Sequence, residues 1–178
     1  MKILETERLF LREFILGDTE FIIELLNSPG WIKYIGDRNV RTTDEAIAYL
    51  ENGPIKSYAL NGFGLCLVGV KENNTPIGMC GILKRDTLEK PDIGFAFLPR
   101  FCSNGYAYEA TKAVLHSVLQ KNKYDQIAAI TLPGNGRSIG LLKKLHFRFE
   151  KKIIDNNEEL ELYSITAGEL KKRLLNKN

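Results

Sequence analysis

The sequence predicts an α+β fold in which helices and strands alternate unevenly around one mixed sheet. Alternating polar and apolar residues typical of strands recur along the chain, and segments with apolar residues at helical spacing lie between them. A turn signal at Asn73-Asn74 between two strand-like runs indicates an antiparallel hairpin. A strand, a helix and a strand in succession over residues 92–132 indicate a parallel crossover. The sheet is therefore expected to contain both pairing directions.

The chain begins with a predicted strand over residues 8–12, where polar and apolar side chains alternate. A helix over residues 17–27 follows, with glycine and aspartate at its start and apolar residues on one face. Ser28-Pro29-Gly30 ends this helix, because proline and glycine interrupt helical geometry. An aromatic loop that contains Trp31 and Tyr34 comes next.

A second helix is predicted by the motif Thr42-x-x-Glu45, which is a capping box. In a capping box each of the two side chains bonds the backbone N–H of the other residue. This helix is expected to continue to Asn52 and to end at Gly53-Pro54. The run Tyr58–Leu60 is typical of a short strand.

The rest of the chain alternates strands with two amphipathic helices. The strands are expected over residues 64–70, 76–83, 92–98, 127–132, 147–154 and 159–165. The helices are expected from Gly105 to about Lys121 and from Asn135 to near His146. A polar connection over residues 84–90 precedes the strand at Asp92, and Asp155-Asn156-Asn157 is a turn signal between the last two strands.

The composition is that of an ordinary globular domain, because 44% of the 178 residues are hydrophobic and 26% are charged. No linker or repeat divides the chain, so residues 1–178 are expected to form one domain. The net charge of +3 is small for a protein that binds nucleic acid, and we expect no nucleic-acid partner.

Three cysteines, Cys66, Cys80 and Cys102, show no pairing motif, which argues against a zinc site and against a disulfide framework. A reducing compartment fits this pattern. The first residues place charges where a signal peptide has its apolar segment, and no apolar run reaches the roughly 18 residues of a membrane span. We therefore expect a cytoplasmic protein without a metal or a membrane partner.

The segment from Asp92 to Ala110 runs from an apolar strand through a short polar turn into the start of a helix. From Arg100 to Gly105, successive backbone N–H groups are expected to point inward at that helix start. The first N–H groups of a helix lack partners and its dipole favours an anion, so a pyrophosphate fits there without a metal. An ordinary strand-to-helix turn explains the same residues.

Five motifs occur in order: Leu4-Glu-Thr-Glu-Arg-Leu-Phe-Leu-Arg12, Asp92-Ile-Gly-Phe, Gly105-Tyr-Ala-Tyr-Glu-Ala110, Asn135-x-x-Ser138 and Leu142-x-Lys144-Leu145-x-Phe147. Together they resemble the GNAT superfamily of N-acetyltransferases, and within it the branch of the ribosomal-protein N-terminal acetyltransferases RimJ and RimL. The resemblance covers nearly the whole chain. It implies a mostly antiparallel sheet of about seven strands with helices on both faces, whose fourth and fifth strands are parallel and splayed around CoA.

Two residues depart from the family pattern. Ser103 and His146 each stand where the corresponding motif usually has glycine. A left-handed conformation at Ser103 would cost about 1 kcal/mol or more, which bears on CoA affinity.

The resemblance implies acetyl-CoA as the acetyl donor. The turn and the helix start would hold its pyrophosphate, the preceding strand would pair with the pantetheine arm, and the Asn135 carboxamide would bond the pantetheine amides. The expected cofactor-binding residues are Phe95, Phe97, Leu98, Arg100, Phe101, Cys102, Ser103, Asn104, Gly105, Tyr106, Ala107, Asn135 and Ser138. A surface ion pair is the alternative explanation for Arg100, and a helix N-cap is the alternative for Asn135.

Direct acetyl transfer to an amine needs a base for the amine and an acid for the departing thiolate. By the resemblance, Asp92 occupies the position of a proposed general base, with a structural charge as the alternative. Leu142 replaces the usual tyrosine acid, so Ser138 is the expected acid unless its hydroxyl bonds back to a helix carbonyl. Glu109 matches a glutamate that the branch carries at the helix start, although the helix dipole alone explains a carboxylate there.

Trp31 and Tyr34 are expected to border the acceptor pocket, or else to anchor the core. The expected function is acetyl transfer to a primary amine, first of all the N-terminal α-amine of a protein. A small amine, amino acid or polyamine is the alternative, although a mildly basic protein has no strong field to attract a polycation. A non-catalytic acyl-CoA-binding regulatory module is the rival from another class, and a homodimer is a family expectation.

Overall fold

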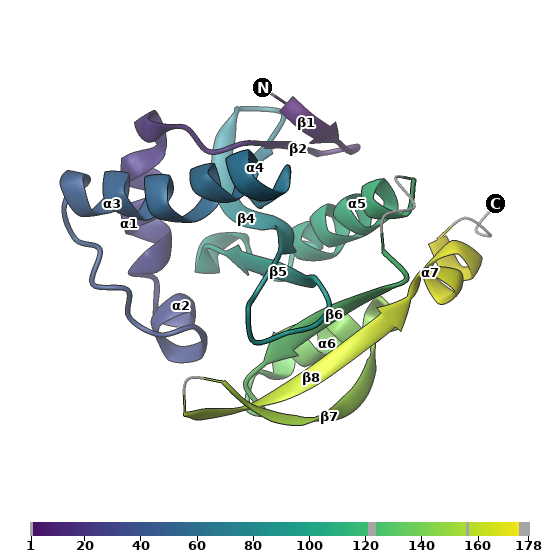
Figure 1. Ribbon diagram of the computed structural model, residues 1–178. Coiled ribbons are helices and arrows are strands. Elements are labelled where there is room, and N and C mark those ends of the chain that lie inside the picture. The colour runs from purple at the N-terminus through teal and green to yellow at the C-terminus, as the bar shows by residue number, and fades with distance from the viewer. Residues whose placement is uncertain (1, 121–123, 156, 175–178) are drawn as a thin grey trace.

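The computed structural model describes residues 2–120, 124–155 and 157–174, and within them eight strands form one sheet (Figure 1). Their spatial order is β1-β2-β3-β4-β5-β6-β8-β7. The strands are β1 (Lys2–Glu5), β2 (Leu9–Arg12), β3 (Leu65–Val70), β4 (Thr75–Leu83), β5 (Asp92–Phe97), β6 (Gln126–Thr131), β7 (Arg148–Asp155) and β8 (Glu158–Thr166). Only β5 and β6 pair in parallel among these strands. The predicted mixed sheet is confirmed, with eight strands in place of about seven.

Helices cover both faces of the sheet, as expected. They are α1 (Thr19–Leu26), α2 (Pro29–Tyr34), α3 (Thr43–Leu50), α4 (Lys56–Asn61), α5 (Tyr106–Gln120), α6 (Gly136–Lys144) and α7 (Ala167–Leu174). In Figure 1, α1 to α4 gather in one half of the molecule and α5 to α7 in the other. Among the described residues, none of these helices is long and apolar enough to cross a membrane.

Alternating side chains of the strands feed two separate hydrophobic clusters, because successive residues of a strand point to opposite faces. On β2, Leu9 and Leu11 join the cluster that packs under α5 to α7, whereas Phe10 joins the cluster under α1 to α3. Leu115 of α5 and Leu25 of α1 are fully buried in these two clusters. The sheet is therefore packed on both faces.

The crossover from β5 through α5 to β6 opens a gap in the sheet. The two strands pair only at Asp92 and Ala128, and the Ala128 N–H donates to the carbonyl of Pro91 at 2.9 Å. Beyond this point the strands separate, whereas their outer neighbours β4 and β8 stay paired with them along their length. The expected splay of two parallel strands is confirmed.

Two local predictions around Pro54 were wrong. The helix that begins at the Thr42 capping box does not end at Gly53-Pro54. It widens to a π-helical segment over Glu51–Ile55, which accommodates a proline that has no N–H to donate. Tyr58–Leu60 is not a strand but part of α4, which ends at the left-handed Gly62.

The ends of the chain and one loop also differ from the predictions. Trp31 and Tyr34 lie in α2 rather than in a loop, because Pro29 is tolerated in the first turn of a helix. The sequence patterns did not predict β1 or α7. Two predicted boundary residues, Lys121 and Asn156, lie outside the described residues.

Candidate active site

A cleft of about 1220 Å³ opens where β5 and β6 separate. Both strands line it, together with the turn before α5, the start of α6, and residues of α2, α3 and α4. Segments that lie far apart in the sequence therefore meet around one space. The two helix starts on its wall, at Gly105 and at Asn135, differ in how their backbone N–H groups are used.

The start of α5 is open. Ser103 and Gly105 both adopt left-handed conformations, with φ of +66° and +81°. The backbone N–H groups of residues 103–108 donate no hydrogen bond to another described residue. Ser103, Gly105, Tyr106 and Ala107 line the cleft, so a row of free donors at a helix N-terminus borders this space. Such a row is suited to an anion.

The start of α6 is capped. The Asn135 side-chain oxygen accepts a hydrogen bond of 3.2 Å from the Ser138 N–H. The Asn135 carboxamide keeps two N–H donors without a partner among the described residues, and the Ser138 hydroxyl likewise has none. Both residues line the cleft. Asn135 is thus an N-cap whose remaining donors are available to a ligand.

Asp92 is buried at the point where β5 and β6 separate, with 1% of its surface exposed. One carboxylate oxygen lies 3.0 Å from Nε of Arg85, and the other has no hydrogen-bond partner in the described structure. Burial raises the pKa of the Asp92 carboxyl, and the nearby Arg85 charge only partly offsets this effect. A carboxylate with a raised pKa is a stronger base, although its ion pair also fits a structural role.

The aromatic side chains expected at the acceptor end line the cleft. Trp31 is 6% exposed and belongs to the hydrophobic cluster under α1 to α3, so it anchors the core and borders the cleft at once. Tyr34 lines the same wall. Three cations, Arg38, Lys56 and Lys84, also line the cleft and form no ion pair with a described carboxylate. The cleft wall therefore carries aromatic and basic side chains, with the carboxylate of Asp86 among its lining residues as well.

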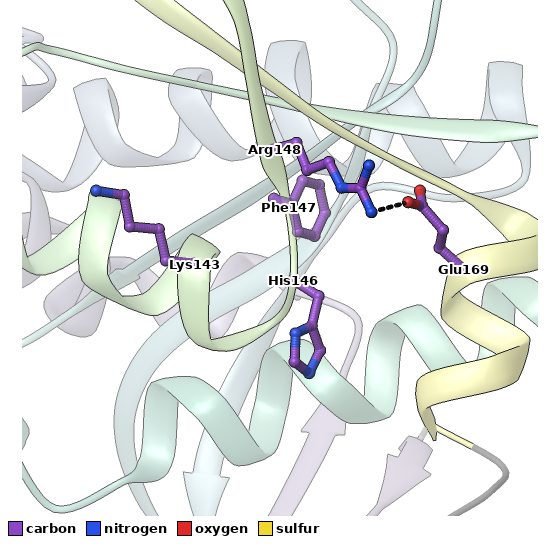
Figure 2. Close-up of a pocket in the computed structure, with 5 residues that line it drawn as sticks. All are labelled: Lys143, His146, Phe147, Arg148 and Glu169. Atoms are coloured by element: carbon purple, nitrogen blue, oxygen red, sulfur yellow. Dashed lines mark ion pairs between the residues drawn. The ribbon is translucent and has the colours of Figure 1, made fainter.

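A second hollow lies at the end of α6 (Figure 2). It is small, about 200 Å³, and holds an ion pair of 2.9 Å between Arg148 and Glu169. Figure 2 shows the Lys143 side chain directed away from this pair. His146 beside them has a left-handed φ of +66°. None of the predicted site residues lines this hollow.

Residues 8–148 match the family described as the acetyltransferase (GNAT) domain. The chain belongs to the GNAT acetyltransferase family. Two proteins of Bacillus subtilis (strain 168) are similar over most of the chain. Protein YkkB is 29% identical over 164 residues, covering 90% of this chain and 93% of YkkB. The N-acetyltransferase YnaD is 29% identical over 157 residues, covering 86% and 89% of the two chains.

Solved structures share the GNAT fold. A GNAT-family acetyltransferase from Bacillus anthracis superposes with a TM-score of 0.77 at 26% identity, covering 95% of this chain and all of the other. RimL, a ribosomal L7/L12 α-N-protein acetyltransferase solved with CoA, superposes with a TM-score of 0.80 at 14% identity, covering 93% and 98% of the two chains. At that identity the likeness to RimL shows the fold alone.

The GNAT assignment makes the protein an acetyl-CoA-dependent N-acetyltransferase. Most of the residues predicted for its site line the cleft, although their contacts with ligands stay predictions. Those residues are Trp31, Tyr34, Asp92, Phe95, Phe97, Phe101, Cys102, Ser103, Gly105, Tyr106, Ala107, Asn135 and Ser138. In the described part of the chain, no group of three or more His, Cys, Asp or Glu residues is arranged to hold a metal ion.

Three residues predicted to bind the cofactor do not line the cleft of this GNAT fold. Leu98 is buried in the cluster under α1 to α3. Arg100 forms a two-pronged ion pair with Glu24 and stacks on the Phe101 ring at 5.0 Å, as in the alternative explanation for it. The Asn104 carbonyl accepts a hydrogen bond of 3.1 Å from Arg8.

Sequence patterns missed the partners of the GNAT site residues. Arg85 was part of a polar connection, and nothing in its neighbourhood predicted an ion pair with Asp92. Arg8 and Glu109 each stood in a family motif, yet only the fold shows that they form a pair. The shared membership of two motifs was the one available signal for that contact.

Proposed function

We propose that this GNAT enzyme transfers acetyl from acetyl-CoA to the N-terminal α-amine of a protein. The observation that carries the donor half of the proposal is the open start of α5 on the cleft between β5 and β6. The acceptor half is supported by RimL, a structural neighbour that is named as an α-N-protein acetyltransferase.

The donor fits the cleft by the chemistry of its parts. The pyrophosphate needs N–H donors and positive potential, which the start of α5 offers at residues 103–107. The pantetheine arm carries two amides, which match the strand edge that β5 exposes beyond Asp92 and the free donors of Asn135. Its thioester then lies deeper in the cleft, which Asp92 and Ser138 both line.

Transfer proceeds by direct attack. The neutral amine nitrogen bonds to the acetyl carbon, the carbon–sulfur bond breaks, and CoA leaves as a thiolate. Asp92 accepts the proton that the amine loses, because its raised pKa makes it a better base than an exposed aspartate. Ser138, whose hydroxyl has no other described partner, donates a proton to the sulfur and regains one from solvent, to which Asp92 releases the proton that it took from the amine. Ser138→Ala is expected to lower kcat and leave the affinity for CoA unchanged.

The acceptor end favours an amine that carries negative charge nearby. Arg38, Lys56 and Lys84 line the cleft without ion-pair partners in the described structure. The lining cations outnumber the lining carboxylates, Asp86 and Asp92, so a polyamine meets net repulsion there. An acidic N-terminal segment meets attraction instead. A small amine that carries a carboxylate, such as a free amino acid, is the second candidate acceptor, because the same cations attract its carboxylate.

Release of free CoA thiol, with mass spectrometry of the products, tests the proposal. The panel contains peptides with acidic, neutral and basic residues after a free α-amine, the same peptides with blocked N-termini, amino acids and polyamines. We expect turnover on the acidic peptides and none on the blocked ones. Faster turnover on a small amine would contradict the protein acceptor. Saturating acetyl-CoA that stabilises the fold by about 2.7 kcal/mol at 100 times its Kd, without thiol release on any amine, would favour the regulatory module.

A further inference from the structure

We infer that Arg8 is a positioning residue for donor binding, which holds the turn before α5 without itself lining the cleft. This inference rests on the proposed function, because it takes the turn to be the pyrophosphate site. Arg8 lies between β1 and β2, about a hundred residues before the turn. It does not line the cleft.

The Arg8 guanidinium contacts three parts of the turn and the helix start. Nη1 donates a hydrogen bond of 3.1 Å to the carbonyl of Asn104, which lies between the left-handed residues Ser103 and Gly105. Nε donates 2.7 Å to the Glu109 carboxylate in the first turn of α5. The guanidinium carbon lies 4.6 Å from the centre of the Tyr106 ring. One side chain thus spans the whole open helix start.

Glu109 completes this arrangement as a fixed anion. The Glu109 carboxylate accepts a hydrogen bond of 2.5 Å from the Thr6 hydroxyl and one of 3.0 Å from the Arg8 backbone N–H. Partial burial acts to raise the pKa of Glu109, but the hydrogen bonds from Thr6 and Arg8 outweigh it and lower the pKa. The Arg8 carbonyl accepts 2.9 Å from the Lys71 N–H, so the segment that carries Arg8 is itself tied to the sheet. The helix start is therefore attached to a rigid support.

Peptide geometry connects this outer contact to the cleft. The carbonyl of residue 104 and the N–H of residue 105 belong to one trans peptide and point in opposite directions. Arg8 holds the Asn104 carbonyl on its own side of the turn. Its Nη2 is so near Gly105 that a β-carbon built on this glycine would lie 3.4 Å from it. The Gly105 N–H is then directed away from Arg8, and Gly105 lines the cleft. Arg8 thereby fixes the direction of a donor that it does not touch.

The test uses a donor that lacks the pyrophosphate. S-acetyl-pantetheine carries the same thioester and pantetheine amides as acetyl-CoA, so it does not use the α5 start. For Arg8→Gln we expect the Kd of CoA and the KM of acetyl-CoA to rise about tenfold. The kcat/KM for S-acetyl-pantetheine is expected to stay that of the parent enzyme. Arg8→Lys keeps the charge but not the forked donors, so its affinity for CoA is expected to lie between that of the parent enzyme and that of Arg8→Gln.

Arg148→Gln is the matched control, because it removes an Arg–Glu pair of 2.9 Å that lies outside the cleft. It is expected to leave the Kd of CoA, the KM of acetyl-CoA and the kcat/KM for S-acetyl-pantetheine unchanged. Equal losses with both donors in Arg8→Gln and Arg8→Lys would show a general structural role and overturn the inference, as would an unchanged Kd for CoA. If the parent protein binds CoA but acetylates no amine, the proposed acetyl transfer is contradicted. The Kd of CoA in the parent, Arg8→Gln and Arg148→Gln then still tests whether Arg8 supports donor binding. Failure of the parent protein to bind CoA would contradict both.

Discussion

Two helix starts face the same cleft, and they treat their backbone donors in opposite ways. At α6 the Asn135 side chain caps the first turn, and the Ile139 N–H bonds the Asn135 carbonyl at 3.0 Å. At α5 the Glu109 N–H bonds the Gly105 carbonyl in the same way, at 3.0 Å, but the N–H groups of residues 105–108 have no described partner. The charged side chains nearby, Arg8 and Glu109, lie outside the cleft. The fold thus caps one helix start with a side chain and leaves the other without a side-chain cap among the described residues.

This difference assigns different ligand chemistry to the two walls. An uncapped helix N-terminus concentrates positive potential and suits a phosphate. The start of α6 uses the Ser138 N–H on the Asn135 cap and presents the side-chain amide of Asn135 to the cleft, which suits a neutral amide group. The proposed function therefore places the pyrophosphate at the start of α5 and the pantetheine beside Asn135 of α6, with Asp92 as the proposed base.

Asp92→Asn gives the largest expected effect, because it acts on the chemistry and not on either wall. If Asp92 is the base, kcat falls by about 100-fold, since general base catalysis contributes at least that much. The affinity for acetyl-CoA is expected to stay the same. The kcat of the parent enzyme should rise with pH through the raised pKa of Asp92, and the variant should lose this dependence. A variant with parental kcat would reduce Asp92 to a structural charge.

The same substitution also changes the pH dependence of stability. The folded pKa of Asp92 is raised, so the folded state holds a proton that the unfolded chain has released. The parent enzyme therefore loses stability relative to Asp92→Asn as the pH rises from about 3.9 through the folded pKa. Urea unfolding of both proteins across this pH range measures the difference in their free energies of unfolding. A parent enzyme that gains stability relative to Asp92→Asn as the pH rises would contradict a pKa raised by burial.

Ala107→Glu closes the open helix start with a carboxylate. Two like charges about 8 Å apart near a protein surface repel by ~2 kcal/mol, so CoA affinity is expected to fall about 30-fold. The free energy of unfolding is expected to stay the same or to rise by about 0.3–1 kcal/mol, because the helix dipole favours an anion there. Calorimetric titration with CoA measures the affinity, and Ala107→Gln controls for size. Parental affinity in Ala107→Glu would place the pyrophosphate elsewhere.

Two substitutions at Asn135 separate its cap from its ligand role. Asn135→Ala removes both, and is expected to lower the free energy of unfolding by about 1 kcal/mol. Asn135→Asp keeps the capping oxygen and loses the amide donors, so its stability should stay parental. Both should weaken acetyl-CoA binding by about 3–10-fold, the loss of one hydrogen bond. Parental binding by Asn135→Asp would mean that Asn135 serves only as a cap.

Ser103→Gly gives the smallest expected effect. It relieves about 1 kcal/mol of left-handed strain at a φ of +66°. Glycine in turn increases the entropy of the unfolded chain by an amount worth about 0.5–1 kcal/mol. We expect the free energy of unfolding to rise by at most about 0.5 kcal/mol, the difference of these two contributions, with CoA affinity unchanged because the backbone N–H remains. His146→Gly, with the same φ outside the cleft, should match it in thermal and urea unfolding. A weaker affinity in Ser103→Gly alone would assign a ligand contact to the serine side chain.

The sequence patterns predicted the mixed sheet and its parallel crossover, because these depend on local periodicity, and the family resemblance implied the splay of the two strands. Most of the residues named for the site line the cleft, because they stand in motifs that are continuous in the chain. The sequence patterns failed at Tyr58–Leu60, where a π-helical segment around Pro54 lets a helix continue. They also failed to connect Arg8 with Glu109, since a pairing across about a hundred residues depends on tertiary structure.

Ser103 shows the same limit at one residue. Its departure from the usual glycine was visible in the sequence, but its left-handed conformation was visible only in the fold. For Asn135, a cap and a ligand-binding role were alternatives, and the structure shows that the oxygen caps while the amide donors stay free. Local patterns named the residues of this site, whereas the division of labour between its two walls came from geometry.

A crystal structure of the enzyme with CoA tests the contrast between the two helix starts most directly. We predict pyrophosphate oxygens within hydrogen-bond distance of the backbone N–H groups of residues 103–107, with the pantetheine along β5 and within reach of the Asn135 amide. A pyrophosphate bound at the start of α6, or outside the cleft between β5 and β6, would contradict it.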